Sequence, residues 1–591
     1  MKLFKSISEV DEKERLSVAK ANYREWCDAD GIDYALRQEL QIIENNENAL
    51  ISGFLTLIDF GTAGLRGKMK AGSANMNIPT VRLATQALAS VVIENGGCEN
   101  GVVIAYDSRN NSREFSREAA CVLAANGIKT YIFDALRPTP ELSFAIRKLG
   151  CKAGINVTAS HNPKEDNGYK VYWEDGAQLP PSEAAAVSER CLKYDFFKDV
   201  KTMDFNTACD KGIITVIGKE IDEEYLSVLH THIISPETVE KQKDLHIIYT
   251  PLHGAGHALV PEALRRAGFN NITTVTEQMV LDGNFPTVKK PNPQYAESFE
   301  LGIKLAEKTG GCDIILATDP DADRVGICAP DRDGGWFLIS GNRAGLLMLD
   351  YVIKQRRANG KLPENAAAVK SIVSTKLAEE ICRKNGVKMI NVYTGFKYIG
   401  EKIKEFERNS SHTFIFGFEE SYGYLGGTYA RDKDAVGASQ LIAEMTAYHK
   451  SCGRTLREAL YNIYEEYGFS AEFSYDVIID ALDIKGKMNE IMEKAYALAD
   501  NTDNLGGIKI ARVKDYKACV VKNISDGSTE KLPFASDNVV AYELDDGTEV
   551  IIRPSGTEPK FKVYSFVSAE NDEKAKEKFE RIKETLSWIE G

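Results

Sequence analysis

Three stretches of the chain share one pattern of apolar and polar positions. In each, an apolar run of strand length precedes an amphipathic helical stretch, a glycine follows the helix, and a second apolar run comes next. The glycines are Gly127, Gly268 and Gly386, and each stands where the end of a helix needs a left-handed backbone. Apolar runs that alternate with helices are typical of α/β domains. The pattern therefore predicts three related α/β/α domains with mainly parallel sheets.

The C-terminal part of the chain has a different pattern. Helical stretches at 456–468 and 486–500 precede alternating apolar runs at 538–553 and 560–569, and a charged helix follows at 572–589. This order indicates a smaller α+β domain. The first ~50 residues have the pattern of helices packed onto the first domain. The expected domain boundaries are 1–215, 216–328, 329–455 and 456–591.

The charge, the lengths of the apolar runs and the cysteine pattern argue against a nucleic-acid-binding, membrane-spanning or secreted protein. The net charge is −14, from 73 basic and 87 acidic residues spread along the 591 positions. Non-specific nucleic-acid binding needs a basic surface, so a nucleic-acid partner is not expected, whereas a locally basic pocket for anions remains compatible with this balance. No apolar run reaches the ~20 residues of a membrane span, and the N-terminus lacks the apolar segment of a signal peptide. With eleven scattered cysteines and no CxxC pair, the chain is expected to be a cytoplasmic protein with reduced thiols.

The loop after the apolar run at 155–157 contains the first candidate catalytic residue, Ser160. A serine hydroxyl is a weak nucleophile unless a neighbour activates it. His161 is adjacent, and in an extended loop its side chain would point away from Ser160, so a serine–histidine pair is not expected. No GxSxG motif surrounds the serine, which disfavours a hydrolase. Taken alone, such a loop is more often structural than catalytic.

Three aspartates follow the next buried run, at 313–317. They are Asp319, Asp321 and Asp323, referred to below as the acidic triplet. Alternate residues of an extended backbone share a face, so the three carboxylates are expected to converge. Carboxylates so close repel one another unless a cation lies between them, and Mg²⁺ prefers such oxygen ligands. The alternative is a solvated acidic turn without a metal.

Two further loops have the chemistry of sugar and phosphate binding. After the apolar run at 414–416 come Glu419 and Ser421, whose side chains suit the vicinal hydroxyls of a sugar; Arg431 and Lys433 follow and are candidates for phosphate contacts. Glu419 could equally cap a helix or pair with Arg431.

The second loop is a turn between two predicted strands near the C-terminus, referred to below as the phosphate-binding turn. Its residues Arg553, Ser555, Gly556 and Thr557 combine a guanidinium, two hydroxyls and a glycine that lets backbone N–H groups approach an anion. A plain hairpin turn is the alternative. Two further candidates are Arg66, in a glycine-rich loop near the start of the first domain, and Lys397, just after the last strand of the third repeat.

Four of these motifs, in this order, resemble the α-D-phosphohexomutase superfamily, which includes phosphoglucomutases and phosphomannomutases. They are TASHNP at 158–163, DPDADR at 319–324, EES at 419–421 and RPSGTEP at 553–559. The long N-terminal segment followed by FGTAGLRGKM looks most like the phosphoglucomutase branch that also contains phosphopentomutases and sugar-bisphosphate synthases. The resemblance implies four domains around a central cleft.

The resemblance also implies how phosphate is transferred. Ser160 would be carried as phosphoserine, and its phosphate and the acidic triplet would bind Mg²⁺. Arg66 and Arg324 would lie beside the transferring phosphate, and Lys170 matches the position of a lysine proposed for proton transfer.

Substrate contacts are implied in the same way. Glu419 and Ser421 would contact sugar hydroxyls, the phosphate-binding turn would bind the phosphate that does not react, and Lys397 matches an active-site lysine of phosphoglucomutases. The sequence departs from the pattern at Phe418, where many relatives have Glu, and this is expected to add bulk beside the sugar-binding loop.

The activity implied is interconversion of glucose 1-phosphate and glucose 6-phosphate through glucose 1,6-bisphosphate, which must turn around between the two transfers. Such an enzyme needs small-molecule sugar phosphates as its partners and would be a monomer or homodimer. The alternatives are phosphomannomutase or phosphopentomutase activity, a sugar-1,6-bisphosphate synthase, and a non-catalytic sugar-phosphate-binding protein. The last predicts a missing serine, metal ligand or phosphate-binding turn, and all of these are present.

Overall fold

The computed structural model of the chain describes residues 10–11, 13–61, 64–479, 484–534, 536–554 and 560–589. It consists of two compact units. The first comprises Met1–Val369 and Gly395–Arg457, and the second comprises Lys370–Thr394 and Glu458–Gly591. Among the described residues, no helix has the length and apolar character needed to cross a bilayer.

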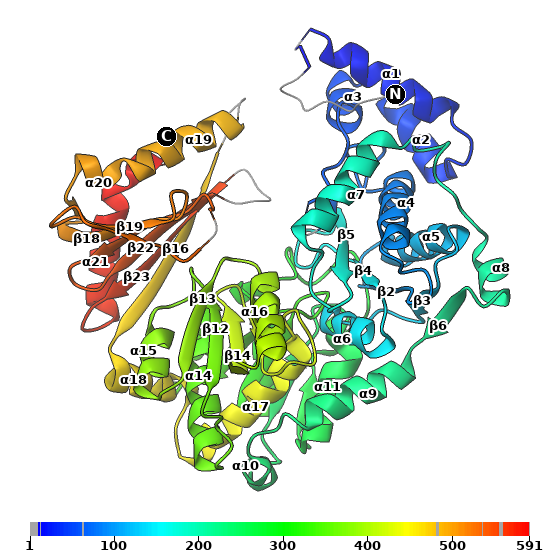
Figure 1. Cartoon of the computed structure of the whole chain (residues 1–591). Coiled ribbons are helices and arrows are strands. Elements are labelled where there is room, and N and C mark those ends of the chain that lie inside the picture. Colours follow the sequence, from blue (N-terminus) through cyan, green and yellow to red (C-terminus); the bar gives the residue numbers. More distant parts are fainter. Residues whose placement is uncertain are drawn as a thin grey trace. The chain divides into compact units, whose positions relative to one another are not determined.

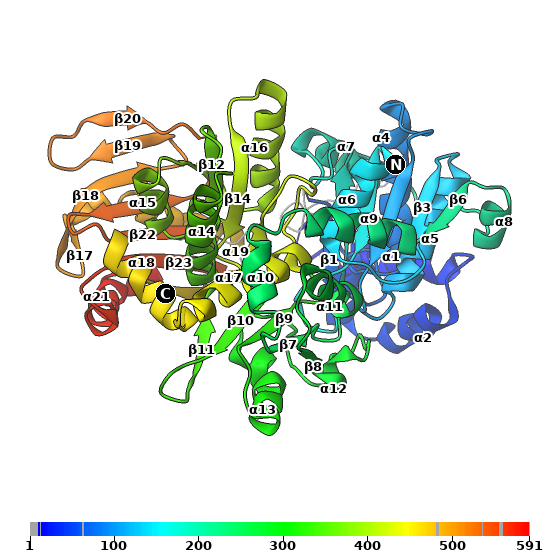
Figure 2. The same cartoon turned by 90° about the horizontal axis from the view of Figure 1, so that it is seen from below.

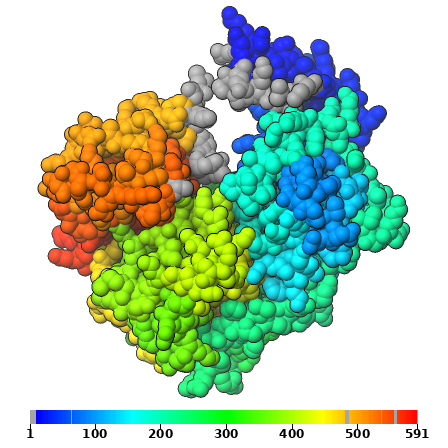
Figure 3. All heavy atoms as spheres, viewed as in Figure 1, coloured from blue at the N-terminus to red at the C-terminus, as the bar shows by residue number. Residues whose placement is uncertain are grey.

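The N-terminal helices pack onto the first α/β domain, as expected. They are α1 (Arg15–Asp28), α2 (Tyr34–Ile43) and α3 (Glu47–Phe54). Trp26 is buried and makes edge-to-face contacts with Phe54 and with Phe196 and Phe197 of the first domain. In the space-filling view the blue atoms of these helices lie directly against that domain (Figure 3).

The first α/β domain is built on a six-stranded sheet of order β1-β5-β4-β2-β3-β6. Helices α5 and α6 both pack against β2 (Figure 1). The elements are β1 (Leu65–Lys68), α4 (Ile78–Glu94), β2 (Val102–Tyr106), α5 (Ser112–Ala125), β3 (Thr130–Phe133), α6 (Thr139–Leu149), β4 (Ala153–Val157), β5 (Asp166–Trp173), α7 (Pro181–Lys193), α8 (Phe205–Asp210) and β6 (Ile214–Ile217).

The second domain has a five-stranded sheet of order β11-β10-β9-β7-β8. Its elements are α9 (Lys219–His230), α10 (Pro236–Lys241), β7 (Ile247–Thr250), α11 (Gly256–Ala267), β8 (Ile272–Thr274), α12 (Thr276–Met279), η2 (Ala296–Phe299), α13 (Glu300–Thr309), β9 (Ile314–Thr318), β10 (Val325–Pro330) and β11 (Trp336–Ile339).

A four-stranded sheet of order β13-β12-β14-β15 follows. Its strands and the neighbouring helices are α14 (Gly341–Ala358), β12 (Ala366–Ser371), α15 (Leu377–Lys384), β13 (Lys388–Val392), α16 (Phe396–Asn409), β14 (Thr413–Glu419), β15 (Gly423–Leu425) and α17 (Ala435–Ser451). The three glycines singled out in the sequence follow α5, α11 and α15 with positive φ, so the three predicted helix ends are confirmed.

The sheets are mixed, whereas the sequence pattern predicted mainly parallel ones. Strand β2 pairs in parallel with β3 and β4, and β7 with β8 and β9. The strands that follow the candidate site loops, β5, β10 and β15, instead run antiparallel to β4, β9 and β14. A short loop suffices to join antiparallel neighbours, whereas parallel ones need a long crossover. The loops that contain Ser160, the acidic triplet and Ser421 are therefore turns of hairpins.

The second unit contains an antiparallel sheet of order β16-β23-β22-β21-β18-β19-β20, with β17 paired to β18; β19 and β20 lie at one edge (Figure 2). Its elements beyond Leu456 are α18 (Leu456–Tyr467), β16 (Ser470–Ile478), α19 (Ile484–Tyr496), α20 (Leu498–Asn501), β17 (Asn504–Leu505), β18 (Ile508–Asp515), β19 (Val520–Asn523), β20 (Thr529–Lys531), β21 (Val540–Leu544), β22 (Glu549–Pro554), β23 (Lys560–Ser568), α21 (Asp572–Thr585) and η3 (Ser587–Ile589). The predicted α+β character is confirmed, and β16 to β20 were not predicted.

Within this unit, Lys370–Thr394 is tied to the C-terminal sheet by charge and by aromatic contacts. Lys376 pairs with Glu543 and Glu549, and Tyr393 packs against Tyr516 and Phe534. The domain boundaries derived from the sequence stay predictions.

Candidate active site

Ser160 lies in the loop between β4 and β5, and its hydroxyl contacts the acidic triplet of the second domain. Ser160 Oγ donates a hydrogen bond to Asp319 Oδ2 over 2.8 Å, and both residues are buried. The Ser160 backbone is left-handed, with φ of 53°, and its N–H donates to Thr158 Oγ1. The structure thus brings together the two motifs on which the sequence analysis depends.

The acidic triplet converges through a tight turn. One carboxylate oxygen of each aspartate lies within 4.8 Å of the others, and all three residues are buried. The expected extended backbone is wrong: the loop between β9 and β10 is a turn in which Ala322 has φ of 49°. Asp319 Oδ1 accepts the N–H groups of Asp323 and Arg324, which fixes the turn. These hydrogen bonds replace the alternation of a strand as the cause of convergence.

Two lysines from other domains partly neutralise the triplet. Lys170 Nζ, on β5, donates to Asp321 Oδ2 over 2.7 Å, and Lys433 Nζ lies 2.9 Å from Asp323 Oδ2. Burial disfavours the charged form of Asp323, but Lys433, Lys170 and Arg324 outweigh burial and keep its pKa below the ordinary value. Burial and then the charges of Asp321 and Asp323 raise the pKa of Asp319 well above its ordinary value. Burial and the repulsion between the carboxylates thus disfavour the charged form of Asp319, and a bound cation would oppose both effects.

The donor set fits a hard divalent cation. Asp321 Oδ1 and Asp323 Oδ1 are buried and have no hydrogen-bond partner, although Arg324 Nε lies 3.7 Å from the latter. A buried carboxylate oxygen without a partner costs free energy, which a bound ion would recover. Carboxylate oxygens together with a phosphate are the usual ligands of Mg²⁺.

The two predicted arginines lie close to these loops. Arg66, on β1, is exposed and donates from Nη1 to Asn162 Oδ1 over 3.3 Å in the Ser160 loop. Arg324 follows the triplet directly and is half-buried. Both guanidinium groups are therefore close enough to the Ser160 loop to attract an anion on Ser160. Their predicted position beside the transferring phosphate stays a prediction.

Glu419 ends β14, and Ser421 is half-buried in the turn that follows. Glu419 Oε1 accepts the N–H of Gly395 over 2.6 Å, at the start of α16. The expected bulk from Phe418 beside this loop is wrong, because neighbouring side chains of a strand point to opposite faces. The Phe418 ring is fully buried, and a Cβ at Gly345 would lie 2.4 Å from it.

The remaining candidates of the first unit are less clearly directed at the triplet. Lys397 is on the first turn of α16, with its Nζ 4.9 Å from the centroid of the Tyr398 ring. Arg431 is buried and pairs with Glu407 while donating to the carbonyl oxygen of Thr428. The pairing of Arg431 with Glu419 that the sequence left open is therefore not observed. Phosphate contacts by Arg431 and Lys433 and a substrate-binding role of Lys397 stay predictions.

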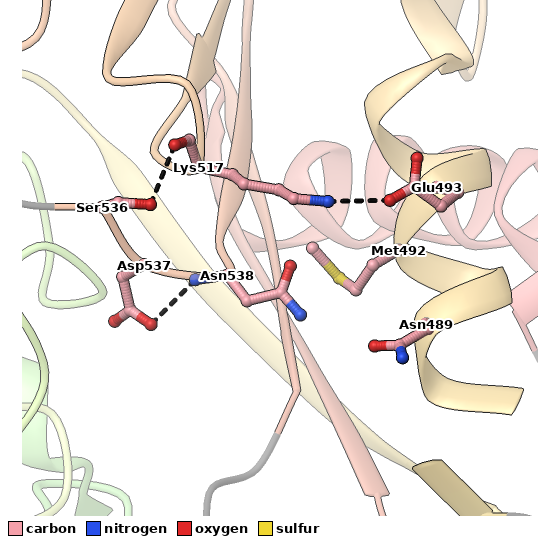
Figure 4. A pocket seen from close by; sticks show the side chains of 7 residues that line it. All are labelled: Asn489, Met492, Glu493, Lys517, Ser536, Asp537 and Asn538. Atoms are coloured by element: carbon pink, nitrogen blue, oxygen red, sulfur yellow. Dashed lines mark hydrogen bonds and ion pairs between the residues drawn. The ribbon is translucent and has the colours of Figure 1, made fainter. Parts of the chain in front are cut away.

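In the second unit, Arg553 is half-buried at the end of β22. Ser555, Gly556 and Thr557 lie outside the described residues, so the phosphate-binding turn stays a prediction. A separate hollow of about 350 Å³ is lined by Asn489, Met492, Glu493, Lys517, Ser536, Asp537 and Asn538 (Figure 4). Its lysine pairs with Glu493, and no predicted site residue lines it.

Comparison with known sequences decides the family. Sequence models of the phosphoglucomutase/phosphomannomutase family match residues 57–198 as its alpha/beta/alpha domain I, 223–334 as domain II and 340–467 as domain III. The phosphoglucomutase of Staphylococcus aureus (strain bovine RF122 / ET3-1) is 35% identical over 523 residues, 88% of this chain and 91% of the relative. The chain belongs to the phosphoglucomutase/phosphomannomutase family. It is a mutase, and the resemblance seen in the sequence is confirmed.

Other relatives of this mutase agree. The phosphoglucomutase of Staphylococcus saprophyticus is 34% identical over 537 residues, covering 91% of this chain and 95% of the relative. Among solved structures, the open form of Paramecium parafusin, a phosphoglucomutase, has a TM-score of 0.66 at 19% identity and covers 90% of this chain and 95% of its own. A phosphoglucomutase/phosphomannomutase family protein from Burkholderia thailandensis has a TM-score of 0.64 at 18% identity, with 90% and 97% covered. The solved structures support the fold.

Arg109 is a residue of the mutase site that the sequence analysis missed. Its buried guanidinium donates to the carbonyl oxygens of three residues of the Ser160 loop and of the first residue of β5, namely Ser160, Asn162, Pro163 and Asp166. Asp107 lies 3.3 Å from Arg109 Nε and accepts from Thr158 Oγ1, the group that receives the Ser160 N–H. The only sequence signal was the position of Arg109 in the loop that follows the strand at 102–106.

Replacing Arg109 with methionine is expected to lower the free energy of unfolding by about 3–5 kcal/mol, because the buried Asp107 carboxylate loses its counter-ion and four carbonyl oxygens lose their donor. Arg109→Lys should rescue little of this, since one ammonium cannot reach the same carbonyl groups together. Urea denaturation measures the loss. Arg113→Met, at an exposed position of α5, is the control and should change stability by less than about 0.5 kcal/mol. An equally small change for Arg109→Met would contradict the role assigned here.

His161 contacts the mutase serine, contrary to the expectation from an extended loop. Because Ser160 adopts a left-handed turn, its Oγ lies 3.1 Å from His161 Nδ1. Burial, and then the positive charges of Arg324 and Arg66, keep the pKa of His161 well below its ordinary value. The imidazole is therefore neutral at physiological pH.

The free energy of unfolding of the mutase is expected to depend on pH through Glu419. Burial and then the charge of Glu420 raise the pKa of Glu419 from 4.5 to about 7. Between these values the folded state binds a proton that the unfolded state lacks, so this residue's contribution to stability falls as the pH rises from about 4.5 to 7. Relative to Glu419→Gln, the wild type is expected to lose up to about 3 kcal/mol across this window. Chemical denaturation of both proteins at each end of the window measures it, and parallel pH profiles would contradict the prediction.

Proposed function

We propose that the protein interconverts glucose 1-phosphate and glucose 6-phosphate through a phosphorylated Ser160. The observation that carries the proposal is the hydrogen bond of 2.8 Å from Ser160 Oγ to Asp319, inside a buried acidic triplet with two unpartnered oxygens. The curated relatives named phosphoglucomutase support glucose as the sugar. The scattered free cysteines support a reducing, cytoplasmic location.

The acidic triplet and the phosphate on Ser160 would bind Mg²⁺, which would supply positive charge to the transferring phosphoryl group. In the first half-reaction the bond from phosphorus to Ser160 Oγ breaks as a bond to a sugar hydroxyl forms; the sugar hydroxyl loses its proton and the serine oxygen gains one, so no net proton is released. We assign Lys170, which Asp321 and Asp323 keep charged, to proton transfer with the serine oxygen. Arg66 and Arg324 would stabilise charge on the phosphoryl oxygens.

The resulting glucose 1,6-bisphosphate must then turn around and return its other phosphate to Ser160. Binding in either orientation requires groups that accept a phosphate or a hydroxyl at both ends of the sugar. Glu419 and Ser421 would contact hydroxyls. Lys397, Arg431, Lys433 and the phosphate-binding turn would contact the phosphate that is not being transferred. Closure around the intermediate would exclude water, which would otherwise hydrolyse the phosphoserine.

A coupled assay tests this proposal. The purified protein is given glucose 1-phosphate with a catalytic amount of glucose 1,6-bisphosphate, and glucose 6-phosphate is detected by its oxidation. Mannose, ribose and deoxyribose 1-phosphates are compared in parallel. Fastest turnover of glucose 1-phosphate supports the proposal. Preference for mannose or a pentose would replace it by phosphomannomutase or phosphopentomutase activity. Turnover that consumes a separate phosphate donor stoichiometrically would replace it by a bisphosphate synthase.

A further inference from the structure

Two buried side chains of the first domain, Asn156 and Thr139, connect to Asp321 through consecutive hydrogen bonds. Asn156, on β4, donates from Nδ2 to Thr139 Oγ1 over 2.6 Å. Thr139, the first residue of α6, donates its hydroxyl to Asp321 Oδ2 over 2.8 Å. Thr139 and Asn156 are both fully buried. Because the Thr139 oxygen already accepts from an amide N–H, its single hydrogen is directed to the carboxylate.

The same oxygen of Asp321 receives a second donor, since Lys170 Nζ lies 2.7 Å from Asp321 Oδ2. Lys170 is the register partner of Asn156 on the neighbouring strand, so the lysine and the amide that donates to Thr139 lie at adjacent positions of the β4–β5 hairpin. Asp321 Oδ2 is thereby occupied by protein donors, and Oδ1 is left buried without a partner. The rotation of this carboxylate is therefore set from the first domain.

The Thr139 backbone has a separate role in the same contact. Its N–H donates to the carbonyl oxygen of Asp321 over 2.8 Å. This bond does not depend on the side chain, so a substitution that removes the hydroxyl keeps the turn of the acidic triplet attached to α6. The hydroxyl, together with Lys170, determines which carboxylate oxygen remains free.

We infer that Thr139 and Asn156 are positioning residues of the cation site: they contact no ligand, but they direct Asp321 Oδ1 toward the ion. The inference rests on the cation site of the proposed function. Partners of this kind typically change metal affinity by about 10- to 100-fold. Neither residue lies in a motif that pointed to the site in the sequence.

The test is titration of the full-length protein with Mn²⁺, followed by the paramagnetic resonance of the free ion, with no substrate present. Thr139→Val is expected to weaken Mn²⁺ binding by about 10-fold or more, and Thr139→Ser to restore it to within about twofold. Asn156→Leu should show a similar loss, and the double variant should be no weaker than either single one, because the two act in series. Thr85→Val removes a buried hydroxyl of α4 that bonds to Val81 and Tyr169, and should leave Mn²⁺ affinity unchanged.

Each outcome is informative. Unchanged Mn²⁺ affinity in a folded Thr139→Val protein overturns the inference, and so does unchanged affinity in Asn156→Leu if the threonine variant fails to fold. A similar loss in Thr85→Val would also overturn it, by showing a general effect of destabilisation. Failure of the wild type to bind Mn²⁺ or Mg²⁺ would instead refute the cation of the proposed function, which separates the two failures.

Discussion

Replacing Ser160 with alanine is expected to reduce interconversion of the sugar phosphates by at least about 10⁴-fold, because the group that forms and breaks the bond to phosphorus is removed. Binding of glucose 6-phosphate should change little, since the residues proposed to contact the sugar remain. The coupled assay measures the first quantity and calorimetric titration the second.

Ser116→Ala is the matched control for Ser160→Ala. The Ser116 hydroxyl is also buried in the first domain, where it donates to the carbonyl oxygen of Ser112. This variant should retain activity near that of the wild type. Near-normal turnover of Ser160→Ala would mean that another residue carries the phosphoryl group, and it would contradict the proposed mechanism.

The second large effect is expected for Asp321→Asn. The substitution keeps the shape of the side chain but removes one charge from the acidic triplet and leaves Lys170 without its nearest counter-ion. Loss of a ligand should cost more than the 10- to 100-fold that outer partners typically cost, so the Mg²⁺ concentration for half-maximal activity should rise by about 100-fold or more. Turnover at saturating Mg²⁺ should fall as well.

Magnesium titration of activity measures this effect. Asp313→Asn, just before β9, removes a partly exposed charge that pairs with Lys450 over 2.7 Å and should leave the titration unchanged. A wild-type Mg²⁺ titration in Asp321→Asn would show that the cation binds elsewhere.

The repeat of the three α/β domains could be predicted because its signals are local. The apolar runs and the glycines that end α5, α11 and α15 depend on neighbouring residues alone. The direction of β5, β10 and β15 could not be read in this way, because periodicity along a strand does not specify which way its partner runs. Strand β20 was missed because all its side chains are exposed and lack an apolar face.

In the candidate site, too, the residues that could be predicted are those in local sequence motifs, and the ones that were missed depend on long-range contacts. Ser160 and the acidic triplet lie in contiguous polar motifs that follow apolar runs, so the sequence pointed to them directly. Arg109 and Thr139 contact partners that are 51 and 182 positions away, and apart from the position of Arg109 after a strand, nothing in their own surroundings distinguishes them from ordinary polar residues. The contact of Ser160 with His161, and the direction of Phe418, depended on a backbone turn and a strand face that only the folded chain specifies.

The left-handed backbone at position 160 bears on why serine, and not threonine, occupies it. Threonine has the same reactive hydroxyl, but its branched Cβ makes a positive φ a genuine outlier, whereas serine tolerates it at a smaller cost. Asp107 and Arg109 fix the loop in this conformation, so the turn cannot readily relax around a bulkier residue. Of the two amino acids with an aliphatic hydroxyl, the conformation of the main chain thus favours serine as the nucleophile at this position.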